Sequence, residues 1–128
     1  MPTMPPELHG LRILVVEDNF LVAESVRDLL DDCGCRTIGP VPRVAPALAL
    51  IESEGLDGAV LDINLGSEFC FPIAALLTER GIPFVFLTGY DDAALIPMAF
   101  RDVPCLSKPF DRHEVAWAAA HRFTRGES

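Results

Sequence analysis

Five short apolar segments recur along the 128-residue chain, and amphipathic stretches separate them. The apolar segments span residues 11–16, 36–41, 58–61, 83–87 and 104–107. Four of them lack the alternation of polar and apolar residues that marks a strand with one exposed face, and the segment 36–41 is the weakest. Continuous apolar segments of this length are typical of parallel strands covered on both faces. The pattern therefore predicts five buried strands.

The stretches between the strands repeat apolar residues every three or four positions, as helices with one buried face do. They predict helices over residues 22–33, 44–51, 72–80 and about 111–123. Gly34 and Gly81 are expected to end two of these helices, because glycine adopts the left-handed conformation of a helix C-cap without strain. A short helix near Asp91 is expected to be irregular because Pro97 interrupts it, and Asp91 with Asp92 is interpreted as its cap.

Strand and helix alternate five times, which predicts an α/β fold with a parallel sheet and helices on both faces. Right-handed crossovers leave few arrangements, and the commonest is the doubly wound, flavodoxin-like strand order 2-1-3-4-5. In that order a ligand crevice forms where strands 1 and 3 leave the sheet in different directions. We expect one domain over residues 11–125, a flexible N-terminal extension over residues 1–10 and a tail over residues 126–128.

The charge balance narrows the class of partner. Ten basic and 19 acidic residues give a formal net charge of −9. Such a surface repels phosphate backbones and anionic lipid, so neither nucleic acid nor a membrane is an expected partner. No apolar run approaches the ~20 residues of a membrane span, and no signal peptide precedes the domain, so a cytoplasmic location is expected. The four cysteines lack metal-site spacing and are interpreted as free, mostly buried thiols.

Polar residues stand where the predicted strands end. These residues are Glu17, Asp18, Asp62, Thr88 and Lys108. Taken singly, an aspartate after a strand is usually a helix cap and a lysine there is usually solvated. Because the carboxyl ends of parallel strands share one edge of the sheet, this set is expected to meet in the crevice. Three carboxylates there repel one another, and a magnesium ion relieves that repulsion.

The same residue types suit phosphoryl transfer. A carboxylate such as that of Asp62 can attack a phosphoryl group and form an acyl phosphate. The transferring group carries spread negative charge, which a metal ion, the Lys108 ammonium and a hydroxyl donor such as Thr88 would balance.

Four motifs carry these residues: ILVVED at residues 13–18, VLDINLG at 60–66, LTG at 87–89 and SKPF at 107–110. In this order and spacing the chain resembles, over essentially its whole length, the CheY-like receiver domain of two-component response regulators. The resemblance implies that Asp62 accepts phosphoryl from a sensor histidine kinase or a histidine phosphotransferase. It also implies that Thr88 hydrogen-bonds the phosphoryl group, that Lys108 pairs with it, and that the Lys108–Pro109 bond is cis.

The resemblance further implies a metal site. Asp18, Asp62 and the backbone carbonyl of Asn64 would bind Mg²⁺, or Mn²⁺ in its place, and Glu17 would act through metal-bound water. A chain that ends at Ser128 is expected to carry no output domain. Its signal would then leave by protein contacts, or the chain would drain phosphoryl from a kinase as a sink.

Residues 83–90 (PFVFLTGY) also resemble the fourth strand of the single-domain FAT GUY regulators, which are associated with histidine kinases of the HWE class. The chain departs from their pattern at Leu87, which replaces an alanine, and at Tyr90, which directly follows Gly89. Gly89 is expected to let its backbone N–H approach the phosphoryl group closely.

Receivers of this family carry an aromatic switch residue three positions before the lysine, where this chain has Cys105. Tyr90 is a candidate replacement, with ordinary packing as its alternative, and ordering of the segment around Pro97 is a second candidate switch. Trp117 is interpreted either as an exposed interface anchor or as a partly buried side chain. If exposed, it places the downstream partner on the surface formed by the short fourth helix near Asp91, the fifth strand at residues 104–107 and the fifth helix at about residues 111–123. A monomer and a phosphorylation-dependent dimer both stay open.

Three other functions fit parts of the pattern. A small phosphatase of the haloacid-dehalogenase type also uses an aspartate nucleophile with magnesium, but no second acidic motif follows Lys108 here. A flavodoxin needs a phosphate-binding first loop, whereas this loop is acidic. A degenerate receiver that binds partners without phosphorylation draws support from Cys105, although the complete set of strand-end residues argues against it. We predict a response regulator that catalyses only its own phosphorylation and dephosphorylation and is otherwise not an enzyme.

Overall fold

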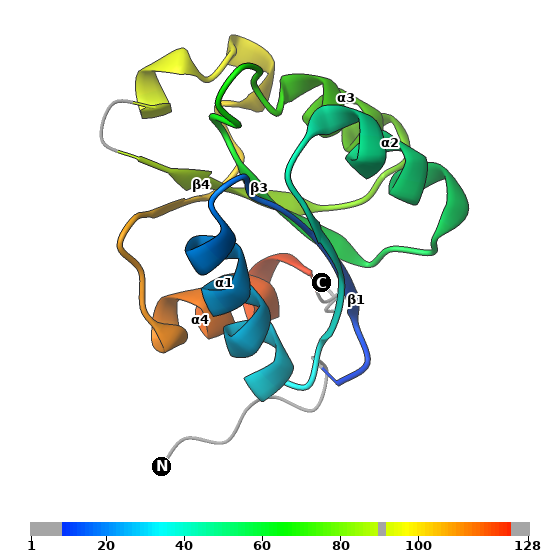
Figure 1. Ribbon diagram of the computed structural model, residues 1–128, viewed down its shortest axis with the longest axis vertical. Helices are drawn as coiled ribbons and strands as arrows, with labels where there is room; N and C mark the ends of the chain where they lie inside the picture. Colours follow the sequence, from blue (N-terminus) through cyan, green and yellow to red (C-terminus); the bar gives the residue numbers. More distant parts are fainter. Residues whose placement is uncertain (1–8, 90–91, 124–128) are drawn as a thin grey trace.

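The computed structural model describes residues 9–89 and 92–123 and contains a five-stranded parallel sheet (Figure 1). Its strands are β1 (Arg12–Val16), β2 (Arg36–Val41), β3 (Gly58–Asp62), β4 (Phe84–Thr88) and β5 (Cys105–Ser107). They lie in the order β2-β1-β3-β4-β5, and each neighbouring pair is parallel. The doubly wound, flavodoxin-like fold predicted from the sequence is therefore confirmed.

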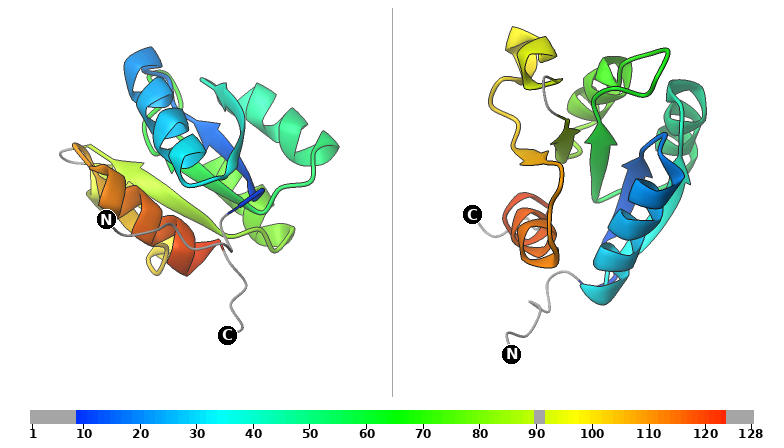
Figure 2. Two further views of the ribbon diagram at one scale, coloured as in Figure 1. Left: turned by 90° about the horizontal axis from the view of Figure 1, so that it is seen from below. Right: turned by 60° about the vertical axis from the view of Figure 1, so that its left-hand side comes forward.

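Helices cover both faces of this sheet. They are α1 (Phe20–Asp32), α2 (Val44–Ser53), α3 (Phe71–Glu79), α4 (Arg112–Arg122) and two short 3₁₀-helices, η2 (Asp92–Leu95) and η3 (Met98–Phe100). Helices α1 and α4 lie on one face, and α2 and α3 lie on the other (Figures 1 and 2). Within the described part of the chain, no helix has the length and apolar character that crossing a bilayer requires.

Strand side chains alternate between two apolar cores, one on each face. The core beneath α1 and α4 receives Ile13, Val15, Val60, Val85 and Leu87. The core beneath α2 and α3 receives Leu14, Val16, Leu61, Phe84 and Phe86. Because both faces are covered, the central strands need apolar residues at every position, which is why they read as continuous apolar runs.

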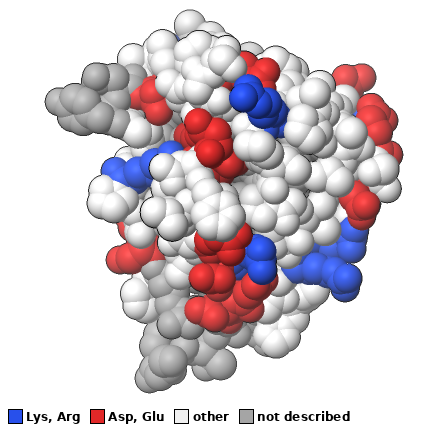
Figure 3. All heavy atoms as spheres, viewed as in Figure 1, with Lys and Arg blue, Asp and Glu red and all other residues white. Residues whose placement is uncertain are grey.

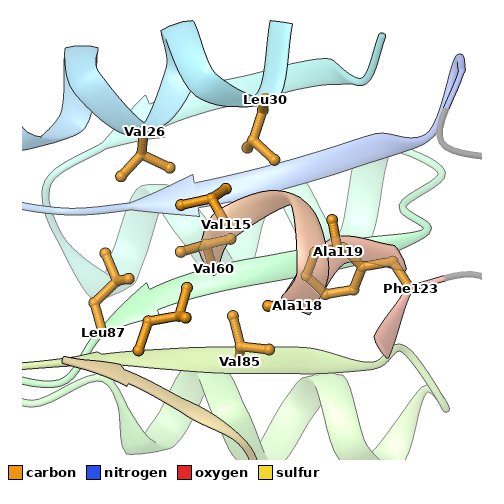
Figure 4. A pocket seen from close by; sticks show the side chains of 10 residues that line it. Val26, Leu30, Val60, Val85, Leu87, Val115, Ala118, Ala119 and Phe123 are labelled. Atoms are coloured by element: carbon orange, nitrogen blue, oxygen red, sulfur yellow. The ribbon is translucent and has the colours of Figure 1, made fainter. Parts of the chain in front are cut away.

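The core beneath α1 and α4 is closely packed (Figure 4). Val26 and Leu30 of α1 point toward the sheet, and Val115 and Phe123 reach the same gap from α4 and its C-cap. The space left among these apolar side chains measures about 10 Å³. A gap this small, without polar partners, does not hold an ordered water. The surrounding side chains are already close-packed, so truncation of one of them would leave a cavity.

Local signals determine where the helices begin and end. Asn19 caps α1 by accepting a hydrogen bond from the backbone N–H three residues on, at 3.1 Å. Asp111 and Glu114 form a reciprocal capping box at the start of α4, with distances of 2.9 and 2.8 Å. Gly34 and Gly81 follow α1 and α3 with φ angles of +87° and +71°. These left-handed positions confirm the predicted helix ends.

The segment between β4 and β5 is irregular, as the sequence predicts. Pro97 has an extended backbone (φ −62°, ψ 155°) and separates η2 from η3. Ile96 and Phe100 on either side of it pack into the core beneath α2 and α3. Leu95 and Met98 are exposed. The segment is therefore held by two apolar anchors and presents apolar side chains to solvent between them.

One backbone feature was not predicted from the sequence. The Gly39–Pro40 bond in β2 is cis, and no sequence signal indicated it. Of the four free thiols, those of Cys33, Cys35 and Cys70 are buried and that of Cys105 is exposed, which agrees with the interpretation of the cysteines.

We expect Leu30→Ala to lower the free energy of unfolding by about 2–5 kcal/mol, because this fully buried side chain leaves a cavity that the close packing cannot close. Urea-induced unfolding followed by circular dichroism measures the change. Leu21→Ala is the matched control on the same helix, since Leu21 is 77% exposed, and it should change stability by less than about 0.5 kcal/mol. Equal losses for both variants would contradict the packing described.

Candidate functional site

The ends of four strands bring the predicted residues to one edge of the sheet. The residues that end these strands or follow them are Glu17, Asp18, Asp62, Thr88 and Lys108. The parallel ladders run in step here, with Asp62 opposite Leu87 and Thr88 opposite Ser107. Residues distant in sequence therefore become neighbours because the strands stop at the same level.

Three carboxylates gather at this edge. Glu17, Asp18 and Asp62 each offer an oxygen atom, and these atoms all lie within 4.8 Å of one another. Glu17 and Asp62 are only 2% and 3% exposed, whereas Asp18 is exposed to solvent. Carboxylates this close repel one another, and burial strengthens the repulsion because little water screens it.

Lys108 supplies the opposite charge. Its Nζ lies 3.1 Å from Oε1 of Glu17 and 3.3 Å from Oδ1 of Asp62. Its backbone N–H donates to the carbonyl of Thr88 at 2.9 Å, and its bond to Pro109 is cis, as the resemblance implies. Burial lowers the pKa of Lys108, but the charges of Asp62 and Glu17 outweigh that effect, and the pKa is raised overall. The side chain is therefore a permanent cation between two buried carboxylates.

The Asp62 carboxyl is the most perturbed of the group. Burial, a hydrogen bond with Glu17 and the charge of Glu17 raise its pKa to about 8, against the opposing effect of Lys108. Without a further cation, Asp62 therefore holds a proton at neutral pH. A group that favours the ionised form would release that proton and leave a nucleophilic carboxylate.

The donor atoms fit a hard divalent cation. All three side chains offer carboxylate oxygens, the ligands that magnesium prefers in proteins. Oε1 of Glu17 pairs with the Lys108 ammonium at 3.1 Å, and Oε2 accepts a hydrogen bond from the N–H of Asn19 at 3.1 Å. Each carboxylate oxygen has two lone pairs, so Glu17 could also accept a hydrogen bond from a metal-bound water.

The loop after β3 folds back toward Asp18. Asn64 Oδ1 accepts a hydrogen bond from the Gly66 N–H at 2.9 Å. Gly66 has φ +92°, and a Cβ at that position would lie 3.4 Å from Oδ2 of Asp18. Glycine is therefore favoured by the left-handed backbone conformation, whereas a Cβ at this distance would make only an ordinary contact with Asp18. Asn64 follows Asp62 by two residues in this loop, and metal binding by its backbone carbonyl stays a prediction.

The end of β4 is hydrogen-bonded to the start of η2. Thr88 is buried, only 4% exposed, and closes the strand. The N–H of the next residue, Gly89, donates to Oδ2 of Asp92 at 3.0 Å. Asp92 lies in the first turn of η2, and its carboxylate reaches back to an N–H that precedes the helix, which agrees with the interpretation of Asp92 as a cap. The sequence did not indicate that the capped amide is that of Gly89, directly after Thr88.

Of the two proposed switch residues, only Cys105 lies in the described part of the chain. Tyr90 lies outside the described residues, as does Asp91. Cys105 is exposed at the start of β5.

Trp117 on α4 is 62% exposed and stacks on His121, with ring centroids 4.0 Å apart. Of the two interpretations of this tryptophan, the exposed side chain is therefore the one that the structure supports.

Comparison with known families places this geometry in a class. The family model of the response regulator receiver domain matches residues 13–120 of the chain. The chain therefore belongs to the receiver-domain family of response regulators. The strand order and the residues at the sheet edge agree with the CheY-like fold that the sequence predicted.

Individual relatives support the same class. The sensory transduction protein LytT of Bacillus cereus is 32% identical over 108 residues, which cover 82% of this chain and 44% of that protein. The chain thus spans about half the length of the curated relatives it matches. The solution structure of SdrG from Sphingomonas melonis Fr1 is 44% identical with a TM-score of 0.78, and the match covers 87% of this chain and 94% of that one. A BeF3-activated conformation of SdrG matches with 45% identity, a TM-score of 0.73 and coverage of 87% and 95%.

The raised pKa of Asp62 predicts a pH dependence of stability in metal-free protein. Because the pKa is about 8 in the fold and 3.8 unperturbed, the bound proton stabilises the fold below both values. That stability is lost as the pH rises through the folded value. We expect the melting temperature in chelator to fall between about pH 5.5 and about pH 8.5, and Asp62→Asn to flatten this slope.

Differential scanning fluorimetry over that range provides the measurement. Asp102→Asn, at an exposed position before β5 begins and so at the opposite end of that strand from Lys108, is the control and should keep the slope of the unmodified protein. An Asp62→Asn variant with an unchanged slope would show that another group carries the pH dependence.

Proposed function

We propose that this receiver domain accepts a phosphoryl group on Asp62 from a histidine kinase or a histidine phosphotransferase. The observation that carries the proposal is the Asp62 carboxylate, buried at a strand end with the Lys108 ammonium 3.3 Å away and two more carboxylates beside it. This arrangement holds a nucleophile, a fixed positive charge and hard metal ligands at one point. The chain would catalyse only its own phosphorylation and dephosphorylation.

In the proposed reaction, an oxygen of ionised Asp62 attacks the phosphorus of phosphohistidine. The new O–P bond forms as the P–N bond breaks, and the imidazole leaves with that electron pair. Lys108, already between Asp62 and Glu17, balances the negative charge of the phosphoryl oxygens, and the Thr88 hydroxyl donates a hydrogen bond to them. Hydrolysis of the acyl phosphate by water then regenerates the carboxylate.

Asp18, Asp62 and the backbone carbonyl of Asn64 would hold Mg²⁺, or Mn²⁺, with Glu17 acting through a water. A bound divalent cation supplies charge neutralisation at the phosphoryl oxygens and favours the ionised form of Asp62. Asp18 suits this role because it is the exposed member of the cluster and can bind an ion arriving from solvent.

A groove beside the site suits the protein that donates the phosphoryl group. It encloses about 430 Å³ and is lined by Leu21, Val22, Ser25, Lys108, Pro109 and Phe110. Lys108 belongs both to the groove and to the carboxylate site, so a protein seated there brings its donor group to Asp62. Acidic side chains gather over α1 next to it (Figure 3), which favours a basic rim on the partner.

A different surface suits the downstream partner. The segments η2, η3, β5 and α4 follow one another down one side of the molecule in the right-hand view of Figure 2. They expose Leu95, Met98 and Trp117. Large apolar side chains, tryptophan above all, are common anchors of protein interfaces.

Residues 83–90 resemble the FAT GUY regulators, and this resemblance supports a histidine kinase of the HWE class as the phosphoryl donor.

A degenerate receiver that binds partners without phosphorylation is the second candidate. The observation in its favour is Cys105, which stands exposed at the position of the family's aromatic switch residue. The phosphatase and flavodoxin alternatives draw no support from the family match.

Incubation with acetyl phosphate and magnesium should add one phosphoryl group to the unmodified protein, detected by intact-mass spectrometry. Asp62→Asn should take up none, because an amide is not a nucleophile at neutral pH. Asp102→Asn serves as the control and should be phosphorylated normally. If neither acetyl phosphate nor beryllofluoride produces an Asp62-dependent complex, the degenerate binding module replaces the phosphoacceptor.

Magnesium should stabilise the fold, by about 2.7 kcal/mol at a concentration one hundred times its dissociation constant. Thermal unfolding with and without magnesium measures the gain. Asp18→Asn should remove most of it, since the cluster loses its exposed carboxylate. Asp28→Asn on the exposed face of α1 removes the same charge elsewhere and should leave the gain intact. A melting temperature of the unmodified protein that ignores magnesium would count against the metal site.

A further inference from the structure

Gly89 and Asp92 hydrogen-bond each other across the end of β4. The Gly89 N–H donates to Oδ2 of Asp92 at 3.0 Å, and the Asp92 N–H donates to the Gly89 carbonyl at 3.4 Å. A Cβ on residue 89 would lie 3.0 Å from the same carboxylate oxygen, closer than side chains normally approach. The carboxylate thus rests directly on the glycine backbone and occupies its single amide donor.

This donor stands next to the phosphoacceptor. Asp62 pairs with Leu87 in the β3–β4 ladder, so Gly89 lies two residues beyond the partner of Asp62. The Thr88 carbonyl accepts a hydrogen bond from the Lys108 N–H on the β5 side of β4. The C=O and N–H of a trans peptide unit point in opposite directions, so the Gly89 N–H points to the β3 side, where Asp62 ends its strand. A phosphoryl group on Asp62 would therefore lie on the side to which this N–H points.

We propose that Asp92 is an internal competitor for the phosphoryl group, holding the Gly89 amide until Asp62 is phosphorylated. The inference rests on the proposed phosphorylation of Asp62 and adds a residue that regulates it. One N–H cannot serve two anions fully, and a phosphoryl group with nearly two negative charges repels a carboxylate at the same donor. Phosphorylation therefore expels the Asp92 side chain from Gly89.

Release of the Asp92 side chain from Gly89 would change the surface that carries Leu95, and it needs no aromatic switch residue. Asp92 is the first residue of η2, and Leu95 in the same 3₁₀-helix is exposed. Ile96 and Phe100 stay packed in the core, so release of Asp92 frees the start of the segment while its end remains anchored. The device needs only a backbone amide and a carboxylate, which fits a chain that has Cys105 where an aromatic residue is usual.

The test compares the affinity for beryllofluoride, a mimic of the phosphoryl group, at saturating magnesium by isothermal titration calorimetry. Asp92→Ala should bind it about 3- to 10-fold more tightly than the unmodified protein, because the Gly89 amide is already free. Asp92→Asn keeps a neutral acceptor in place and should fall between the two. Asp62→Asn provides the blank.

Asp57→Ala is the matched control. Asp57 forms the same reciprocal pair with Arg12, accepting from its N–H at 2.9 Å and donating to its carbonyl at 2.8 Å. It lies where β1 begins, at the opposite end of the strands from the site. The substitution removes the same charge and the same kind of hydrogen bond, and should leave the beryllofluoride affinity within twofold of that of the unmodified protein.

Unmodified protein provides a test that needs no variant. The side-chain carboxyl ¹³C resonance of Asp92 and the Gly89 amide resonance should shift together as beryllofluoride is added. An Asp92 resonance that stays in place, or an Asp92→Ala affinity equal to or weaker than that of the unmodified protein, would overturn the competitor while leaving Asp62 as phosphoacceptor. Absence of any Asp62-dependent binding would instead remove the proposed function itself, and the competitor with it.

Discussion

The Lys108 ammonium lies between the buried carboxylates of Glu17 and Asp62, and the rest of the site is built around that contact. Lys108 offsets part of the burial and repulsion that favour a proton on Asp62, although the pKa of Asp62 stays raised. The cation comes from the residue after β5, and its backbone is tied to Thr88 at the end of β4. The charge balance of the site therefore depends on the strands ending in register, and the chemistry of Asp62 on the whole sheet.

The segment after β4 links this site to the surface. Asp92, the first residue of η2, accepts a hydrogen bond from the Gly89 N–H, and Ile96 and Phe100 further along the segment pack into the core. Pro97 prevents a continuous helix, so the segment is two short turns rather than one rigid rod. Residues 93–95 before the Ile96 anchor are exposed, so this part of the segment can change its conformation at little cost in free energy.

Much of the fold could be predicted because its signals are local. Continuous apolar runs between amphipathic stretches imply parallel strands covered by helices, and Gly34 and Gly81 end their helices where the sequence places them. The strand-end residues could also be predicted, since parallel strands direct their carboxyl ends to one edge. Asp92 was also predicted as a cap, but its partner was not, because the acidic residue at a helix start does not by itself identify the amide that it binds.

The sequence by itself determined the type and order of the elements, the family and the set of residues at the sheet edge, because each depends on neighbours along the chain or on topology. Only the tertiary structure decided that Lys108 lies between Glu17 and Asp62, that Gly89 gives its donor to Asp92, and that Trp117 is exposed. These outcomes depend on distances of a few ångströms between side chains from different strands and turns. Such distances follow from the packing of the whole domain, which no local pattern encodes.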